Sequence, residues 1–198
     1  RQSTSPAMSV ATASAAASPA VVSETQASLP GADGTLDKET KRGVKAVLEE
    51  FYTIRDNQEV RECLVEMVHP NAMGAVLMLF LKSAIERKDA DRENFLNLLP
   101  SLHTEAPNLL TVEQATAGMT NFYSLLDDIM IDVPHAGVNS AAVMATLVSN
   151  SICSLSVLKE ETFFESWRAG EHVMQVLGRM VEIYDGRDSG SGSGLAEK

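Results

Sequence analysis

The sequence is short of positive charge. It contains 16 Lys and Arg against 27 Asp and Glu, which gives a formal net charge of -11 at pH 7. Between residues 93 and 158 there is no Lys or Arg at all. Because phosphate binding needs clustered cationic side chains, this balance argues against nucleic acid and anionic membrane surfaces as direct partners. A basic protein partner remains compatible with it.

Cysteine and long apolar runs are also scarce. The two cysteines, Cys63 and Cys153, fit neither a disulfide framework nor a zinc pattern. Both stand in apolar helical contexts, which favours buried, reduced thiols and a cytoplasmic location. The longest apolar run, residues 75–81, is too short to span a membrane. The Ser/Ala-rich start has no apolar segment typical of a signal peptide.

Motifs of catalysis and of metal binding are missing. There is no Gly-rich phosphate loop, no His-Glu-x-x-His pattern and no nucleophile elbow around a serine. The carboxylates Asp127, Asp128 and Asp132 lack the central Gly and distal Glu of a calcium loop. The histidines are scattered over different segments, which favours loop, cap or core roles: His69, His103, His135 and His172. We therefore expect no enzyme activity, no cofactor and no metal.

Composition divides the chain into three parts. Residues 1–35 consist mainly of Ser, Ala, Thr, Val and Pro, and such a segment cannot bury enough surface to offset its ordering entropy. We expect a disordered leader there. Residues 36–185 are predicted to form one helical domain, and residues 186–198 a flexible Gly/Ser tail.

The central part follows helical periodicity throughout. Asp37 is a predicted N-cap, and Asp56 with Glu59 and Thr111 with Gln114 have the spacing of capping boxes. Residues 71–87 are apolar almost all round, which predicts a central, buried helix. About eight helices with short connections predict an all-α fold of stacked antiparallel hairpins, a HEAT-like α-solenoid. The expected segments are 38–54, 57–68, 71–87, 89–102, 112–126, 134–152, a helix around 163–167, and 173–181.

An acidic junction stands out at residues 125–135. The periodicity places Asp127 and Asp128 at the C-terminal end of the fifth helix, where the helix dipole disfavours negative charge by roughly 0.3–1 kcal/mol each. Pro134 is predicted to start the sixth helix. Two interpretations stay open. Asp128 or Asp132 caps the following turn while Asp127 is simply solvated, or the carboxylates form a surface that meets a basic partner.

Two blocks of the sequence resemble the MA3 domain family. Residues 49–67 (EEFYTIRDNQEVRECLVEM) are similar to the first helical hairpin of that family. Residues 125–135 (LLDDIMIDVPH) resemble its most recognisable segment, in which an Asp-x-x-x-Asp-Val-Pro-His element is the specific part. The resemblance covers roughly residues 40–184. MA3 domains occur in the eukaryotic initiation factor 4 gamma scaffolds and in programmed cell death protein 4.

The resemblance implies a function in protein interaction. It implies that the domain has no catalysis of its own and docks the DEAD-box RNA helicase initiation factor 4A through the acidic junction. Asp128 would be the main contact, with Asp127 and Asp132 beside it, while Pro134 would shape the turn. Residues 160–164 and the apolar helix after them are similar to the scaffold members. The alternatives are an inhibitor that uses the same surface, and an unrelated helical scaffold that binds peptides in an apolar groove.

Overall fold

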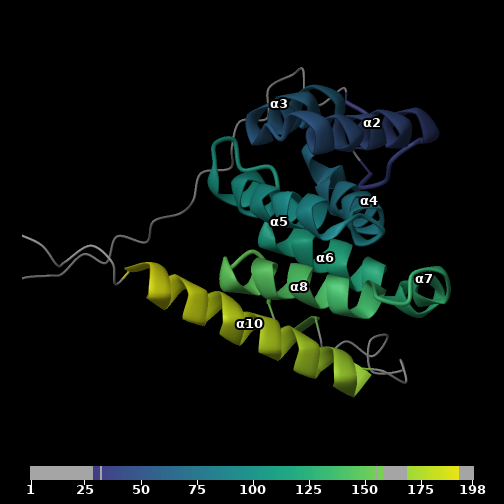
Figure 1. The fold of residues 1–198 in the computed structure, drawn as a ribbon. Coiled ribbons are helices and arrows are strands. Elements are labelled where there is room, and N and C mark those ends of the chain that lie inside the picture. Colours follow the sequence, from purple (N-terminus) through teal and green to yellow (C-terminus); the bar gives the residue numbers. More distant parts are fainter. Residues whose placement is uncertain (1–28, 32, 155, 158–168, 192–198) are drawn as a thin grey trace, which may run out of the picture.

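The computed structural model describes residues 29–31, 33–154, 156–157 and 169–191. Within these ranges the chain forms eight α-helices, one 3-10 helix and no strand, which confirms the predicted all-α fold (Figure 1). The expected helix around residues 163–167 lies outside the described residues. The elements are α2 (Lys38–Ile54), α3 (Asn57–Met67), η1 (Pro70–Ala72), α4 (Met73–Ile85), α5 (Asp89–Thr104), α6 (Val112–Tyr123), α7 (Leu126–Asp132), α8 (Ala136–Ser149) and α10 (Ala169–Ser191).

The helices are stacked in layers. Figure 1 shows α2 and α3 at one end and α10 at the other, with α4, α5, α6 and α8 between them. Helix α4 packs against α2, α5, α6 and α8, and α8 in turn packs against α10. The residues of α4 that face these neighbours, Val76, Leu77, Phe80 and Leu81 among them, are almost completely buried. This confirms α4 as the central helix that its apolar composition predicts.

Three predicted helix starts are confirmed by their hydrogen bonds. The Asp37 carboxylate accepts a bond of 2.7 Å from the Thr40 N–H, and Asp56 caps α3 in the same way. At the start of α6, the Gln114 N–H donates to the Thr111 hydroxyl over 3.3 Å, and the Gln114 side chain accepts from the Thr111 N–H over 3.0 Å. These side chains satisfy N–H groups that the helix itself leaves without partners.

A turn at Pro30 and Gly31, within the segment that the sequence assigns to the leader, packs against the η1 segment. The Pro30 carbonyl accepts a 3.0 Å hydrogen bond from the His69 N–H. Gly31 has a φ of 99°, and a Cβ there would come within 2.6 Å of the Ala72 Cβ. Leu36 is buried. Composition does not distinguish the two cases, because Pro and Gly are as typical of a tight packed turn as of a linker.

Helical structure also extends past residue 185, where the sequence places the end of the domain. Helix α10 continues to Ser191, into the segment for which the sequence predicts a flexible tail. Packing against α8 starts helix α10. After that, each added residue orders one pair of backbone dihedral angles and gains one hydrogen bond, so the helix extends easily. A glycine in such an extension costs only about 1 kcal/mol.

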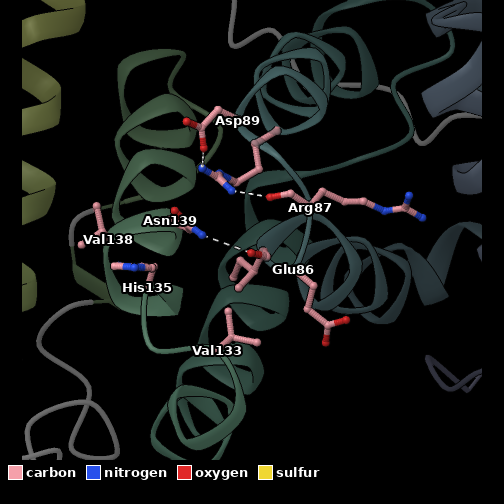
Figure 2. Close-up of a pocket in the computed structure, with 9 residues that line it drawn as sticks. Glu86, Arg87, Asp89, Val133, His135, Val138 and Asn139 are labelled. Carbon is pink, nitrogen blue, oxygen red and sulfur yellow. Dashed lines mark hydrogen bonds and ion pairs between the residues drawn. The ribbon is translucent and has the colours of Figure 1, made fainter.

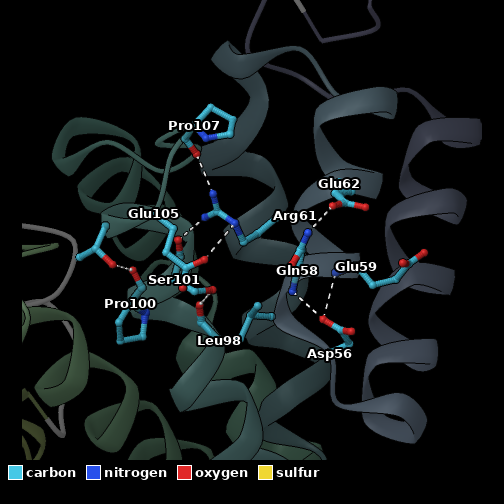
Figure 3. A network of polar contacts seen from close by, with 11 residues as sticks. Asp56, Gln58, Glu59, Arg61, Glu62, Leu98, Pro100, Ser101, Glu105 and Pro107 are labelled. Carbon is cyan, nitrogen blue, oxygen red and sulfur yellow. Dashed lines mark hydrogen bonds and ion pairs between the residues drawn. The ribbon is translucent and has the colours of Figure 1, made fainter.

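A buried arginine joins α3 to the end of α5. Arg61 is 4% exposed, and its guanidinium donates to the carbonyl oxygens of Ser101 and Pro107, the latter at 3.1 Å (Figure 3). Its Nε also lies 3.5 Å from a carboxylate oxygen of Glu105. A cation at this position suits the negative end of the α5 dipole. The sequence did not single out Arg61, because its partners lie about 40 residues further along the chain.

The most apolar helices, α4 and α8, owe their composition to burial in the core. In the part of the chain that the structure describes, no single helix is both long and apolar enough to cross a membrane. Among the described residues, one pair of helices, Asn57–Met67 and Pro70–Ile85, has that length and composition in combination, and its halves are bent by 118°.

Candidate functional site

Asp127 and Asp128 lie in the first turn of a separate short helix, and not at the end of the preceding one. Helix α6 ends at Tyr123, and the Leu125 N–H turns back to the Phe122 carbonyl over 3.0 Å. Helix α7 then begins at Leu126. The predicted conflict between these two carboxylates and a helix dipole is therefore wrong. At the N-terminal end of α7, the dipole favours negative charge.

The unfavourable position belongs to Asp132 instead. This residue is the last of α7, where the dipole disfavours a carboxylate. Asp128 stands four residues earlier, on the same helical face, and like charges at this spacing repel by a few tenths of a kcal/mol. Neither Asp128 nor Asp132 has an ion-pair partner among the described residues. Local electrostatics therefore leave this face of α7 able to accept a cation from another molecule.

All three carboxylates point away from the core. Asp127, Asp128 and Asp132 are exposed, and together they form what we call the acidic surface of α7. The opposite side of the helix is buried or half-buried and packs against the core, through Leu126, Ile129, Met130 and Val133. The structure thus brings the three predicted acidic residues together on one short helix.

Pro134 lies in the turn before α8 and does not start that helix. Helix α8 begins at Ala136, whose N–H donates to the Val133 carbonyl over 2.9 Å. Pro134 itself is exposed. A proline disfavours helical backbone at the residue before it, and Val133 accordingly ends α7 with φ -124° and ψ 84°. The predicted role of Pro134 in shaping the turn fits this geometry, although its predicted place at the helix start was wrong.

One contact joins the start of α8 to α4, and another joins it to α7. The Asn139 side chain donates a 3.1 Å hydrogen bond to the Ile85 carbonyl at the end of α4, as Figure 2 shows. Gly137 faces Met130 of α7, and a Cβ at position 137 would stand at an ordinary van der Waals distance of 3.6 Å from the Met130 sulfur. Sequence reasoning missed both residues. The sequence hinted at them only through an Asn and a Gly in the first turn of a predicted helix.

A hollow lies beside the turn, lined by Ile85, Glu86, Arg87, Asp89, Arg92, Val133, His135, Val138 and Asn139 (Figure 2). Its two arginines are engaged by other groups. Arg87 pairs with Glu49, which raises the pKa of the guanidinium, and its Cζ lies 4.6 Å from the centre of the Tyr52 ring. Arg92 pairs with Asp89 and donates to the Arg87 carbonyl. Both cations beside the hollow are therefore already paired with other groups of the molecule.

Among the described residues, no group of three or more His, Cys, Asp or Glu side chains could hold a metal ion. Both cysteines are free thiols. Burial raises the pKa of Cys153, and together with the neighbouring Glu59 it raises the pKa of Cys63. Because a thiol reacts as the thiolate, a raised pKa lowers the reactivity of both cysteines.

Comparison with known proteins gives a family match that contains the acidic surface. The family described as "MA3 domain" matches residues 40–154. The chain is 33% identical to eukaryotic translation initiation factor 4G of Oryza sativa over 110 residues, which are 56% of this chain and 6% of that protein. It is 27% identical to the same factor of Triticum aestivum over 146 residues, 74% of this chain and 10% of that protein.

A further relative carries a different name. A von Willebrand factor A domain-containing protein of Dictyostelium discoideum is 25% identical over 144 residues, 72% of this chain and 7% of that protein. The chain thus spans at most a tenth of the length of these relatives. The similarity between these relatives and this chain is therefore confined to a small part of each relative.

Proposed function

Because this chain belongs to the MA3 domain family, we propose that it is a protein-interaction domain that docks the DEAD-box RNA helicase initiation factor 4A and tunes its activity in translation initiation. The family and its relatives among the initiation factor 4G proteins support a translation-related, helical interaction domain. In this proposal the domain acts in the cytoplasm and supplies no catalytic residue, cofactor or metal.

The acidic surface of α7 is the observation that carries the proposal. Asp127, Asp128 and Asp132 are exposed on one seven-residue helix, and the chain has no Lys or Arg between residues 93 and 158. The buried side of α7 and the Asn139 hydrogen bond hold this helix in place. A preformed surface of one charge loses little conformational entropy when it binds a partner.

A basic partner would gain from this surface in two ways. Cationic side chains placed opposite Asp128 and Asp132 would relieve the repulsion between these two carboxylates and the unfavourable dipole at the end of α7. The summed negative charge would also speed the encounter of the two proteins at low ionic strength. Binding should therefore weaken steeply as salt is added, because exposed charges are screened.

The test is a titration of the purified helicase against the chain at low and high salt. We expect Asp127→Asn combined with Asp128→Asn to weaken binding roughly tenfold or more at low salt and to flatten the salt dependence. The matched control is Glu62→Gln combined with Glu66→Gln, which removes the same charge from exposed positions of α3. Equal binding by the wild type and the α7 double variant would contradict the assignment of this surface.

Helicase activity in the same complex tests whether the chain supports or inhibits the helicase. A scaffold domain should support or tune RNA unwinding and ATP hydrolysis by the helicase, whereas an inhibitor should suppress unwinding. Helicase assays with and without the chain, at a saturating concentration, separate these outcomes. A peptide-binding scaffold of another kind would bind through apolar contacts and would be insensitive to salt.

A further inference from the structure

Ile131 is the most exposed of the large apolar side chains in the part of the chain that the structure describes. It is 79% exposed, compared with 68% for Met174, 57% for Ile54 and 50% for Val138. It stands on α7, one residue before Asp132. Single exposed aliphatic residues are common on protein surfaces. The position of this one, within the acidic surface, is what calls for an explanation.

The fold does not need Ile131. Four other residues of this short segment, Leu126, Ile129, Met130 and Val133, already attach α7 to the core. Helix formation does not favour it either, because β-branched side chains lose rotamer freedom in a helix. A polar residue would leave the folded state equally well packed and the surface more soluble.

Two carboxylates flank Ile131 on the preceding turn. In a helix, residues three and four apart are neighbours, so Asp128 and Asp127 lie next to Ile131 on the preceding turn. Asp132 follows it directly in the chain. The result is an exposed apolar side chain bordered by carboxylates on one side of α7. Energetically dominant residues of protein interfaces have polar neighbours, which exclude water from the central contact.

Resting on the proposed function, we infer that Ile131 is the apolar anchor of the α7 interface. Its side chain inserts into an apolar pocket of the helicase whose rim carries Lys or Arg. Charge complementarity identifies this occupant, since Asp128 and Asp132 are exposed and have no ion pair among the described residues, so Lys or Arg at the rim of the pocket would pair with them. The helicase surface is therefore an apolar depression within a basic patch.

The anchor and the carboxylates perform different tasks in this arrangement. The carboxylates act over a distance and govern the rate of association and its dependence on salt. Ile131 acts only in contact, by removing apolar area from water, and so governs the rate of dissociation. The contribution of Ile131 should persist at high salt, where that of the carboxylates is screened.

The experiment compares Ile131→Ser with the wild type in binding to the purified helicase over a range of salt concentrations. Ile and Ser have similar helix propensities, so the substitution leaves α7 intact. We expect affinity to fall roughly tenfold to a hundredfold at every salt concentration, with an unchanged slope of log Kd against log salt. Ile131→Leu, which keeps the apolar volume, should restore most of the affinity. Ile54→Ser is the matched control on α2 and should bind as the wild type does.

The outcomes separate the two proposals. If Asp127→Asn with Asp128→Asn weakens binding while Ile131→Ser stays within twofold of the wild type, this inference is overturned and the proposed function stands. If the wild type does not bind the helicase, both are overturned. A thermal unfolding midpoint that drops by several degrees in Ile131→Ser would show a role in folding, and would also overturn the inference.

Discussion

Gly118 of α6 lies directly against the backbone of Gly74 of α4. A Cβ at position 118 would stand 2.8 Å from the Gly74 carbonyl oxygen, and a Cβ at position 74 would stand 3.0 Å from the Gln114 carbonyl oxygen. Helices α4 and α6 are among the most extensively packed pairs of the molecule. Because neither glycine has a side chain, the backbones of α4 and α6 can approach this closely.

Gly118→Ala should lower the free energy of unfolding by about 1–3 kcal/mol, the usual cost of overpacking a core. In an open helix the same substitution stabilises by roughly 1 kcal/mol, but here the added methyl group would meet backbone atoms that cannot move aside. Urea unfolding followed by circular dichroism measures the difference. Gly178→Ala in α10 is the control, because no atom of another described segment lies within 4 Å of its Cβ position. It should be neutral or stabilising, and a Gly118→Ala variant as stable as the wild type would contradict the close contact.

Arg61→Ala should destabilise the fold by roughly 2–4 kcal/mol. The substitution leaves the Ser101 and Pro107 carbonyl oxygens without their donor, and each buried acceptor that loses its partner costs about 1–3 kcal/mol. Glu105 is largely exposed, so its carboxylate can return to water without a further penalty. Arg42→Ala, at an exposed position of α2, should change stability by less than about 0.5 kcal/mol. Chemical denaturation of both variants tests this, and equal stabilities would be incompatible with a structural role for Arg61.

Stability should fall as the pH rises above 10. Burial raises the pKa of Tyr52 to about 12, partly opposed by Arg87, and raises the pKa of Tyr123 well above its ordinary value. In the unfolded chain both phenols ionise near pH 10, so between pH 10 and 12 the unfolded state binds fewer protons than the folded state and becomes favoured. Below pH 10 this contribution is fully present and constant.

The measurement is urea unfolding at a series of pH values from 8 to 11. Tyr52→Phe should show a shallower loss of stability than the wild type over the alkaline part of the range, since one of the two linked ionisations is gone. Lysine ionisation affects the two proteins alike and cancels in the comparison. Identical pH profiles would mean that Tyr52 titrates equally in both states.

Helix starts could be predicted from the sequence because they depend on local chemistry. Asp37, Asp56 and Thr111 each cap the helix that follows, and in each case the group they bind lies within three residues. The central place of α4 was equally accessible, since a helix that is apolar on all sides has to be surrounded. The family resemblance is confirmed by the match to residues 40–154.

The break between α6 and α7 could not be predicted in the same way. No Gly or Pro marks it, and Leu125 and Leu126 continue the apolar pattern across the turn. The assignment of Asp127 and Asp128 to the wrong end of a helix followed from that continuity. Arg61 and Asn139 were missed for another reason. Their partners are 40 and 54 residues away, so only the folded chain brings them together.

The division of α7 into an attached side and a solvent side has an evolutionary consequence. Residues 126, 129, 130 and 133 anchor the helix, whereas residues 127, 128, 131 and 132 face outward. Substitutions at the outward positions leave the core contacts untouched. Under the proposed function, related copies of this domain could therefore diverge in partner preference at three or four outward positions without losing the contacts that hold α7 on the core.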